Sequence, residues 1–147
     1  MVMDSSFISR LTEILRTSSP SLQVKDASVL EYLVTLEANA AAATSAGIEL
    51  ALDVVFRKGS TSAHNMDNHL EQYAVQVEEI SLATAAASRL LAKMLDFNEF
   101  YQRIDAAYFI LLLRNILKSS IILLGTKDWV ATYMPSKAPV QVLMRWK

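Results

Sequence analysis

The sequence predicts an all-α protein built from stacked helical repeats, and three observations support this fold class. The 147 residues include only three Gly and three Pro, so few positions interrupt a helix. Apolar residues recur every three or four positions, which is the spacing of one helix face. The order of apolar positions also repeats at long range along the chain. At this length we expect a single domain, residues 1–147.

The first half of the chain is predicted to hold four helices separated by short breaks. Asp4, Ser5 and Ser6 are candidate caps for the first helix. That helix ends before Pro20, which lacks an amide donor, and Gly47 separates the third helix from the fourth. The predicted helices, with their inward-facing residues, are Phe7–Arg16 (Phe7, Leu11, Ile14, Leu15), Gln23–Glu37 (Ala27, Leu30, Leu33, Val34, Leu36), the Ala-rich Asn39–Ala46, and Ile48–Lys58 (Ile48, Leu52, Val55, Phe56).

A polar segment separates the two halves. Residues Gly59 to Gln72 are rich in turn formers, and we expect a surface loop there that is inserted into the domain. Three further helices are predicted after it. They are a long helix from Tyr73 or Val77 to Asp96 (inward-facing Ile80, Ala83, Ala87, Leu90, Leu91, Met94), a short connector Phe97–Ala106, and an apolar helix Tyr108–Lys118. The last of these is apolar enough to be buried on more than one side.

The carboxyl end is less regular. A last segment begins at Thr126, and the helical period is lost at Pro135 and Pro139. We therefore expect an irregular tail over residues 135–147.

The internal repeat is carried by two shifts that agree with each other. A shift of 41 residues carries the inward-facing set of the first helix onto that of the fourth. A shift of 61 residues aligns the second predicted helix with the long helix, matching Ala27, Leu30, Leu33 and Val34 with Ser88, Leu91, Met94 and Leu95. The same shift aligns the fourth predicted helix with the last one, matching Leu52, Val55 and Phe56 with Leu113, Ile116 and Leu117. The two shifts differ by 20 residues, which matches one insertion at the polar segment. Their sum, 102, carries Leu22, Lys25 and Asp26 onto Leu124, Lys127 and Asp128.

The unit from Ser18 to Gly59, SSPSLQVKDASVLEYLVTLEANAAAATSAGIELALDVVFRKG, resembles the armadillo repeat. It has the break at Ser18–Pro20, a Leu-rich long helix, and the entry Ala46–Gly47–Ile48 into the next helix. It is similar to the armadillo-repeat proteins that are abundant in plants. The resemblance covers most of Phe7 to Trp129 and implies a right-handed α-solenoid, armadillo- or HEAT-like, of about two to three helical repeats.

The sequence departs from the family in two respects. The family's long helix usually carries Ala where this chain has Asp26 and, later, Asp128. Cargo-binding members display a Trp–Asn ladder on the concave face of the stack. The matching positions of this chain are Ser28, Tyr32, Arg89 and Lys93, so the resemblance places these four residues on the concave face but does not support the binding of extended basic peptides.

The ends of the chain also differ from those of a complete repeat array. The chain opens within a repeat, at its middle helix, and closes within another, at its long helix. Because a repeat buries its apolar face only against its neighbours, we expect a fragment or a short divergent member of the family.

Composition excludes several kinds of chemistry. The chain has no Cys, which excludes disulfides, thiolate metal sites and thiol nucleophiles. His64 and His69 are the only histidines; five residues apart in a polar segment, they predict solvated side chains, and no metal site is expected. No phosphate-binding loop or nucleophile elbow is present, so we expect neither an enzyme nor a cofactor.

The charge and hydropathy of the chain limit the kinds of partner that we expect. The formal charge of −1 gives no general attraction to nucleic acid, which is a disfavoured partner. The longest apolar run, Ala106 to Leu113, is too short to cross a membrane. The amino end lacks the apolar core of a secretory signal, which favours an intracellular protein over a secreted one.

The sequence thus predicts a non-catalytic module that binds a protein or peptide segment on the concave face of a helical stack. Two alternatives remain open at this stage. One is a homo-oligomer formed through the uncapped repeat ends. The other is weak nucleic-acid binding through a basic strip around Arg89 and Lys93.

Overall fold

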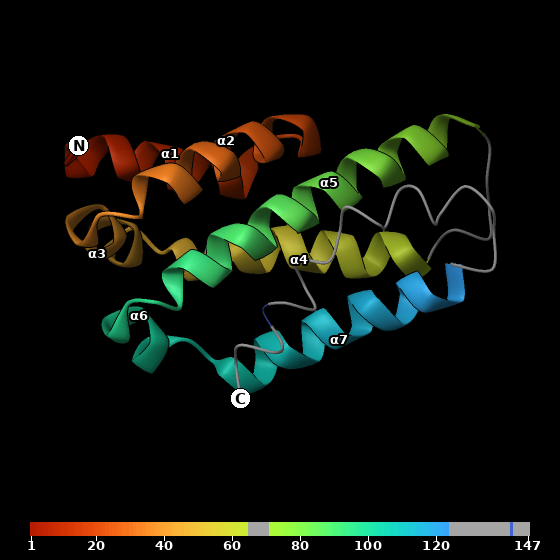
Figure 1. Ribbon diagram of the computed structural model, residues 1–147. Coiled ribbons are helices and arrows are strands. Elements are labelled where there is room, and N and C mark those ends of the chain that lie inside the picture. Colours follow the sequence, from red (N-terminus) through yellow and green to blue (C-terminus); the bar gives the residue numbers. More distant parts are fainter. Residues whose placement is uncertain (65–70, 124–141, 143–147) are drawn as a thin grey trace.

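The computed structural model describes residues 1–64, 71–123 and 142. Over these residues the chain forms seven α-helices and no strand, which confirms the all-α prediction (Figure 1). The predicted segment from Thr126 lies outside the described residues, as does the predicted tail except for Val142. The helices are α1 (Ser5–Thr17), α2 (Pro20–Leu33), α3 (Glu37–Ser45), α4 (Ile48–His64), α5 (Glu71–Met94), α6 (Asn98–Arg103) and α7 (Ala106–Leu123).

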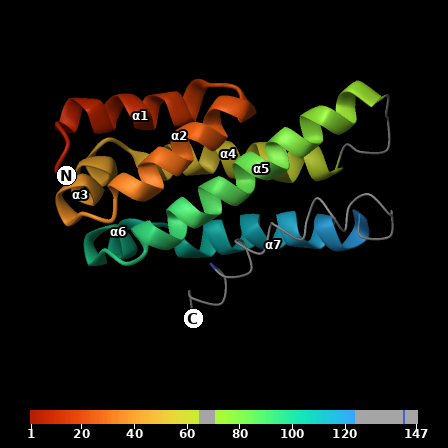
Figure 2. The same cartoon turned by 45° about the horizontal axis from the view of Figure 1, so that its top comes forward.

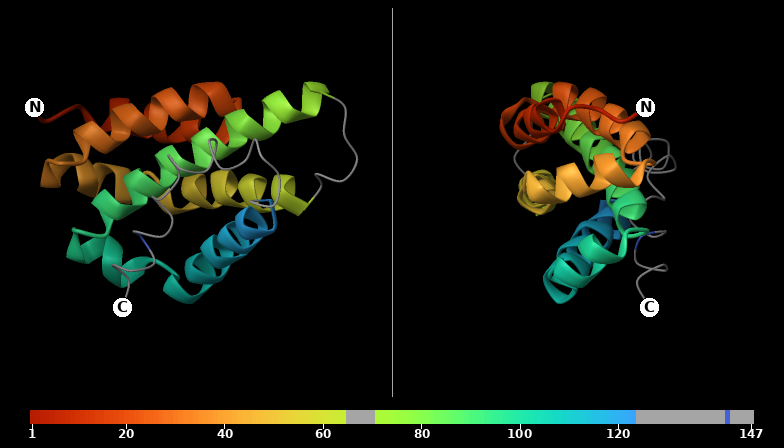
Figure 3. Two further views of the ribbon diagram at one scale, coloured as in Figure 1. Left: turned by 45° about the vertical axis from the view of Figure 1, so that its right-hand side comes forward. Right: turned by 90° about the vertical axis from the view of Figure 1, so that its left-hand side faces the viewer.

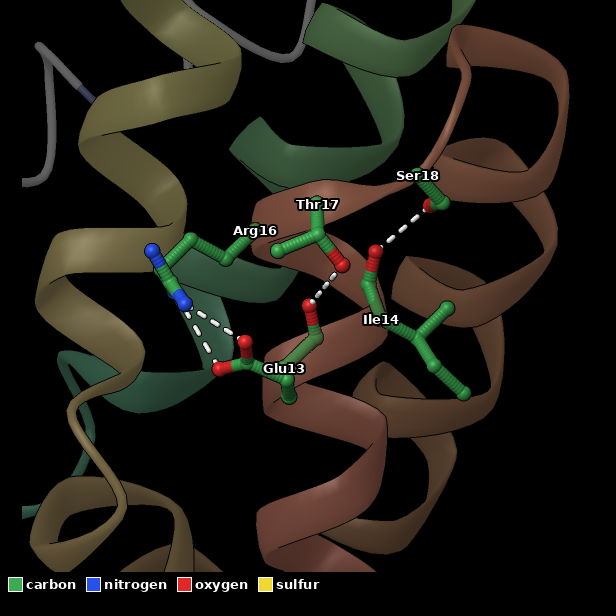
Figure 4. A network of polar contacts seen from close by, with 5 residues as sticks. All are labelled: Glu13, Ile14, Arg16, Thr17 and Ser18. Carbon is green, nitrogen blue, oxygen red and sulfur yellow. Dashed lines mark hydrogen bonds and ion pairs between the residues drawn. The ribbon is translucent and has the colours of Figure 1, made fainter.

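Side chains close both ends of α1. At its start the Asp4 carboxylate accepts a hydrogen bond from the backbone N–H of Ser6 at 3.0 Å, as expected for a capping residue. At its end the Thr17 hydroxyl donates to the Glu13 carbonyl, and the Ser18 hydroxyl donates to the Ile14 carbonyl (Figure 4). The Ile14 carbonyl also accepts the backbone N–H of Ser18 at 2.9 Å, so the Ser18 hydroxyl adds a second bond to it. Helix α1 ends at Thr17, three residues before Pro20.

Helix α2 starts earlier than the sequence suggests. It begins at Pro20 and not near Gln23, because proline fits the first turn of a helix, where its missing N–H has no partner to lose. It ends at Leu33, and the buried Asn39 then organises the turn into α3. The Asn39 amide donates to the carbonyls of Leu33 and Met1, and its oxygen accepts from the N–H of Met3. One side chain thereby holds the amino-terminal residues against the turn.

Gly47 and Gly59 were both expected to interrupt the helices, but only Gly47 does so. Gly47 has φ of +86°, a conformation that favours glycine, and it separates α3 from α4 as predicted. Gly59 was expected to begin a loop, but α4 continues through it to His64, and α5 begins at Glu71. The predicted loop Gly59–Gln72 is therefore too long, and only residues 65–70 lie outside the described helices. Gly59 is buried in α4, and a Cβ there would lie 2.5 Å from the Thr84 Oγ1 of α5.

The core lies between the helices, and most predicted inward residues belong to it. Its largest fully buried side chains include Phe56, Phe109, Leu30, Leu52, Leu90, Leu91 and Leu113. The rings of Phe56 on α4 and Phe109 on α7 meet edge to face, with centroids 6.1 Å apart.

Three predictions of burial were wrong. In α1 the buried residues are Ile8, Thr12 and Leu15, while Phe7 is 40% exposed, so the helix is rotated from the expected orientation although Leu15 faces inward as predicted. Leu36 lies in the turn after α2 and is exposed. Helix α7 is not buried on several sides, because Tyr108 and Leu111 face solvent and Leu111 is 60% exposed.

The helices pack in three successive groups. Helix α1 packs on α2, and this pair lies on α4 and α5, with α1 against α4 and α2 against α5. Helix α4 then packs on α7, and α3 contacts α1, α4 and α6. Figures 2 and 3 show the resulting order, with α1 and α2 at one end, α4 and α5 in the middle, and α7 at the other end.

Among the described residues, no single helix is both long enough and apolar enough to cross a membrane. Helix α3 and residues 48–61 of α4 reach that length and composition only as a pair, which is bent by 74°. Ala43 and Leu52 of this pair belong to the core, whereas Leu50 is 65% exposed.

Candidate functional site

The four predicted partner-binding residues lie on two helices that pack against each other. Ser28 and Tyr32 belong to α2, and Arg89 and Lys93 belong to α5. All four are exposed, and Tyr32 is 77% exposed. We call this set the α2–α5 surface.

An ion pair joins the two helices within the α2–α5 surface. The Arg89 Nε lies 3.4 Å from the Glu31 carboxylate, and the two side chains are 43% and 26% exposed. An exposed pair of this kind contributes about 0–1 kcal/mol to stability, so its main effect is to hold Arg89 beside α2. Glu31 was not predicted as a site residue, because nothing in its local sequence shows which residue of a distant helix it faces.

The remaining members of the surface differ in what they offer a partner. The Ser28 hydroxyl donates to the Val24 carbonyl of its own helix at 2.8 Å, so its oxygen is left as an acceptor. The exposed Tyr32 ring presents apolar area with a polar tip, a combination that is common at binding hot spots. Lys93 is exposed and adds a positive charge one helical turn from Arg89.

A second polar cluster, which the sequence did not predict, joins α4 to the start of α7. The Tyr108 hydroxyl donates to the Asp53 carboxylate, and that carboxylate also pairs with Arg57 at 3.1 Å. The backbone N–H of Asp105 donates to Glu49 at 3.2 Å. The hydrogen bond to Asp53 raises the pKa of Tyr108, because that bond is made only by the protonated phenol. These contacts fix how α7 meets α4.

Two of the cavities on the described surface lie beside α3. One, of about 370 Å³, lies between α3 and the turn into α6 and is lined by Glu37, Thr44, Phe97 and Glu99 among others. The other, of about 430 Å³, lies between α1 and α3 beside Ser9 and small side chains. Within the described part of the chain, no three His, Cys, Asp or Glu residues are grouped so as to hold a metal ion. The side chains of His64 and His69 lie outside the described residues.

Comparison with known proteins gave no relative from which a function can be transferred. No protein-family model matches the chain, and neither the curated proteins nor the solved structures include a match to it.

Proposed function

We propose that the chain is a right-handed α-solenoid of the armadillo type that binds a segment of a partner protein without catalysis. The proposal is supported by which helices pack on each other. Helices one repeat apart pack on each other, α1 on α4, α4 on α7, α2 on α5 and α3 on α6. This succession is expected when a unit of three helices is stacked sideways, each unit covering the apolar side of the next.

In this proposal the α2–α5 surface binds the partner, and the main support is the exposure of Tyr32. A tyrosine that is 77% exposed on a regular helix covers no core of its own chain. Next to it, the ion pair between Glu31 and Arg89 fixes two side chains before a partner arrives. Preformed helices and fixed side chains lose little conformational entropy on binding, which suits an interaction surface.

The charges of the surface suggest the kind of segment that it accepts. Glu31 neutralises Arg89 in part, whereas Lys93 and Lys25 are exposed. A partner segment with an acidic residue beside an apolar or aromatic one fits this arrangement best. No cofactor or metal ion takes part in the proposed function.

The test uses two variants of the surface and one control. Tyr32→Ala and Lys93→Glu remove the ring and reverse the charge, while Tyr101→Ala removes a 42% exposed tyrosine from α6. Affinity capture with mass spectrometry identifies the protein retained by the wild type, and calorimetric titration with the captured protein then measures Kd. We expect each surface variant to raise Kd at least about tenfold, as for loss of a binding hot spot, and Tyr101→Ala to leave it unchanged. Equal Kd values for the wild type and both surface variants would exclude this site.

A further inference from the structure

Two buried side chains of α2 carry oxygens that have no hydrogen-bond partner. Gln23 and Asp26 both belong to the buried side of the helix, and their spacing of three residues makes them neighbours on that side. In the part of the chain that the structure describes, the buried side-chain atoms without a partner are the Gln23 Oε1 and the Asp26 Oδ2. Because a buried acceptor without a donor costs free energy, two of them side by side on one helix call for a common explanation.

The orientation of the Gln23 amide is fixed by α1. Its Nε2 donates to the Leu15 carbonyl at 2.9 Å. A carbonyl only accepts, so the amide cannot turn its nitrogen toward Asp26 without leaving the Leu15 carbonyl unpaired. The Gln23 Oε1 therefore stays an acceptor. An ionised Asp26 would bring a second acceptor, and no donor, to the same side of α2.

The helices that pack on α2 do not supply the missing donor. The buried hydroxyls of Thr12 on α1 and of Thr84 and Ser88 on α5 each donate to a carbonyl four residues earlier in their own helix. The charged side chains described on these two helices are Arg10, Glu13 and Arg16 on α1 and Glu78, Glu79, Arg89 and Lys93 on α5. None of them shifts the pKa of Asp26, which burial alone raises to about 7.

We propose that Asp26 is protonated in the folded chain and donates to the Gln23 Oε1, so that one proton satisfies both oxygens and keeps α2 packed against α1 and α5. We call this pair the proton site. When the proton leaves for solvent, the carboxylate regains its hydration only if α2 moves away from its neighbours. The proposal rests on burial and hydrogen bonding and not on the role of the α2–α5 surface.

The proton site makes the packing of α2 depend on pH. Once α2 has opened, the Asp26 carboxyl has its ordinary pKa of 3.8, whereas in the closed helix its pKa is about 7. The stabilisation is therefore complete below the ordinary pKa and is lost as pH rises through the raised one. An opening of α2 near neutral pH would also move Ser28 and Tyr32, which lie on the same helix.

Carbon-13 NMR of the Asp26 carboxyl in the full chain tests whether the proton is there. In the wild type the carboxyl signal is expected to titrate with a midpoint of about 7. A midpoint near 3.8 overturns the proposal, because Asp26 would then be ionised in the folded chain and a bound water would supply the donors.

A variant of Gln23 tests whether this residue accepts the proton. Gln23→Met keeps a side chain of similar length and removes the oxygen, so the Asp26 midpoint is expected to fall by at least about one pH unit, a tenfold weaker hold on the proton. The matched control is Gln102→Met, which makes the same change at an exposed position of α6 and should leave the midpoint where it is. A Gln23→Met midpoint that is unchanged or higher overturns the role of Gln23, since added apolar surroundings alone would raise it.

Native-state hydrogen exchange tests the release of α2. After correction for the pH dependence of chemical exchange, opening at the amides of Ala27 and Leu30 is expected to rise at least about tenfold between pH 5 and pH 7. In Asp26→Asn the new amide donates to the Gln23 Oε1 at every pH, so opening should stay constant. Glu78→Gln, which removes an exposed carboxylate from α5, should keep the wild-type rise. No rise in the wild type, or a rise that persists in Asp26→Asn, overturns the proposed release.

Discussion

Among single residues, the buried polar side chains of α2 stand out. Asp26 is 5% exposed and Gln23 is 1% exposed, and both face the core. The Gln23 amide nitrogen donates to the Leu15 carbonyl, but its oxygen and one Asp26 oxygen have no hydrogen-bond partner. Burial raises the pKa of Asp26 from 3.8 to about 7, because the ionised carboxylate loses its hydration. The comparison with the armadillo repeat marked Asp26 as unusual, but a sequence pattern does not show that one oxygen of its carboxyl lacks a hydrogen-bond partner.

The raised pKa of Asp26 predicts how stability depends on pH. Between about pH 4 and pH 7 the folded chain keeps a proton that the unfolded chain releases, so the free energy of unfolding falls as pH rises through this window. Asp26→Asn removes the ionisation and adds a donor near Gln23. We expect it to raise the free energy of unfolding by about 1–2 kcal/mol at pH 8 and to change it little at pH 4. Urea denaturation at both pH values measures the difference.

Glu78→Gln is the control for this experiment, since Glu78 is an exposed carboxylate on α5. Its pH profile should run parallel to that of the wild type. If the pH profile of Asp26→Asn also ran parallel to that of the wild type, Asp26 would be ionised in the folded chain at pH 8 without a loss of stability.

At the scale of helices, the sequence predicted all seven described elements in their order, because 3–4 periodicity marks a helix face wherever it lies. The prediction failed where packing between helices decides the structure. The segment after Gly59 looks like a loop by composition, yet α4 continues there because a residue without a side chain lets α4 approach Thr84 on α5. Local composition shows that a glycine is present but not whether it serves a turn or a close contact. The orientation of α1 was missed for a similar reason, since Phe7 and Ile8 are both apolar and only the neighbouring helices select Ile8.

The close contact at Gly59 predicts that Gly59→Ala lowers the stability of the protein, whereas Gly→Ala inside a helix usually raises it. Replacing Gly by Ala inside a helix commonly stabilises by about 1 kcal/mol. Here the new Cβ would lie 2.5 Å from Thr84 Oγ1, whose hydroxyl is held by a bond to the Ile80 carbonyl. We therefore expect Gly59→Ala to lower the free energy of unfolding by about 1–3 kcal/mol, as overpacked cores do.

A double-mutant cycle with Thr84→Ala isolates this contact. In the Thr84→Ala background the obstructing hydroxyl is gone, and Gly59→Ala should then be neutral or stabilising in thermal denaturation. A substitution that stabilised the protein equally in both backgrounds would show that α4 and α5 are farther apart at this point.

At the scale of the whole molecule, the way the helices assemble limits what a sequence can reveal about the α2–α5 surface. The resemblance to the armadillo repeat predicted Ser28, Tyr32, Arg89 and Lys93 as surface residues, and all four are exposed. It gave no sign of Glu31, because the pairing with Arg89 exists only once α2 lies on α5. The contacts of Asp53 and Glu49 with the start of α7 were missed for the same reason. Helical periodicity predicts where the helices lie, but not the polar contacts between them.

Burial also predicts which part of the molecule opens first. Leu52 on α4 and Leu91 on α5 are fully buried, whereas Ile14 on α1 is half-buried and Phe7 on the same helix is 40% exposed. Amides in segments with fewer buried contacts exchange through smaller unfolding events. In native-state hydrogen exchange we expect the amides of Leu52 and Leu91 to exchange at least about tenfold more slowly than that of Ile14. Equal protection of Ile14, Leu52 and Leu91 would mean that α1 opens only together with α4 and α5.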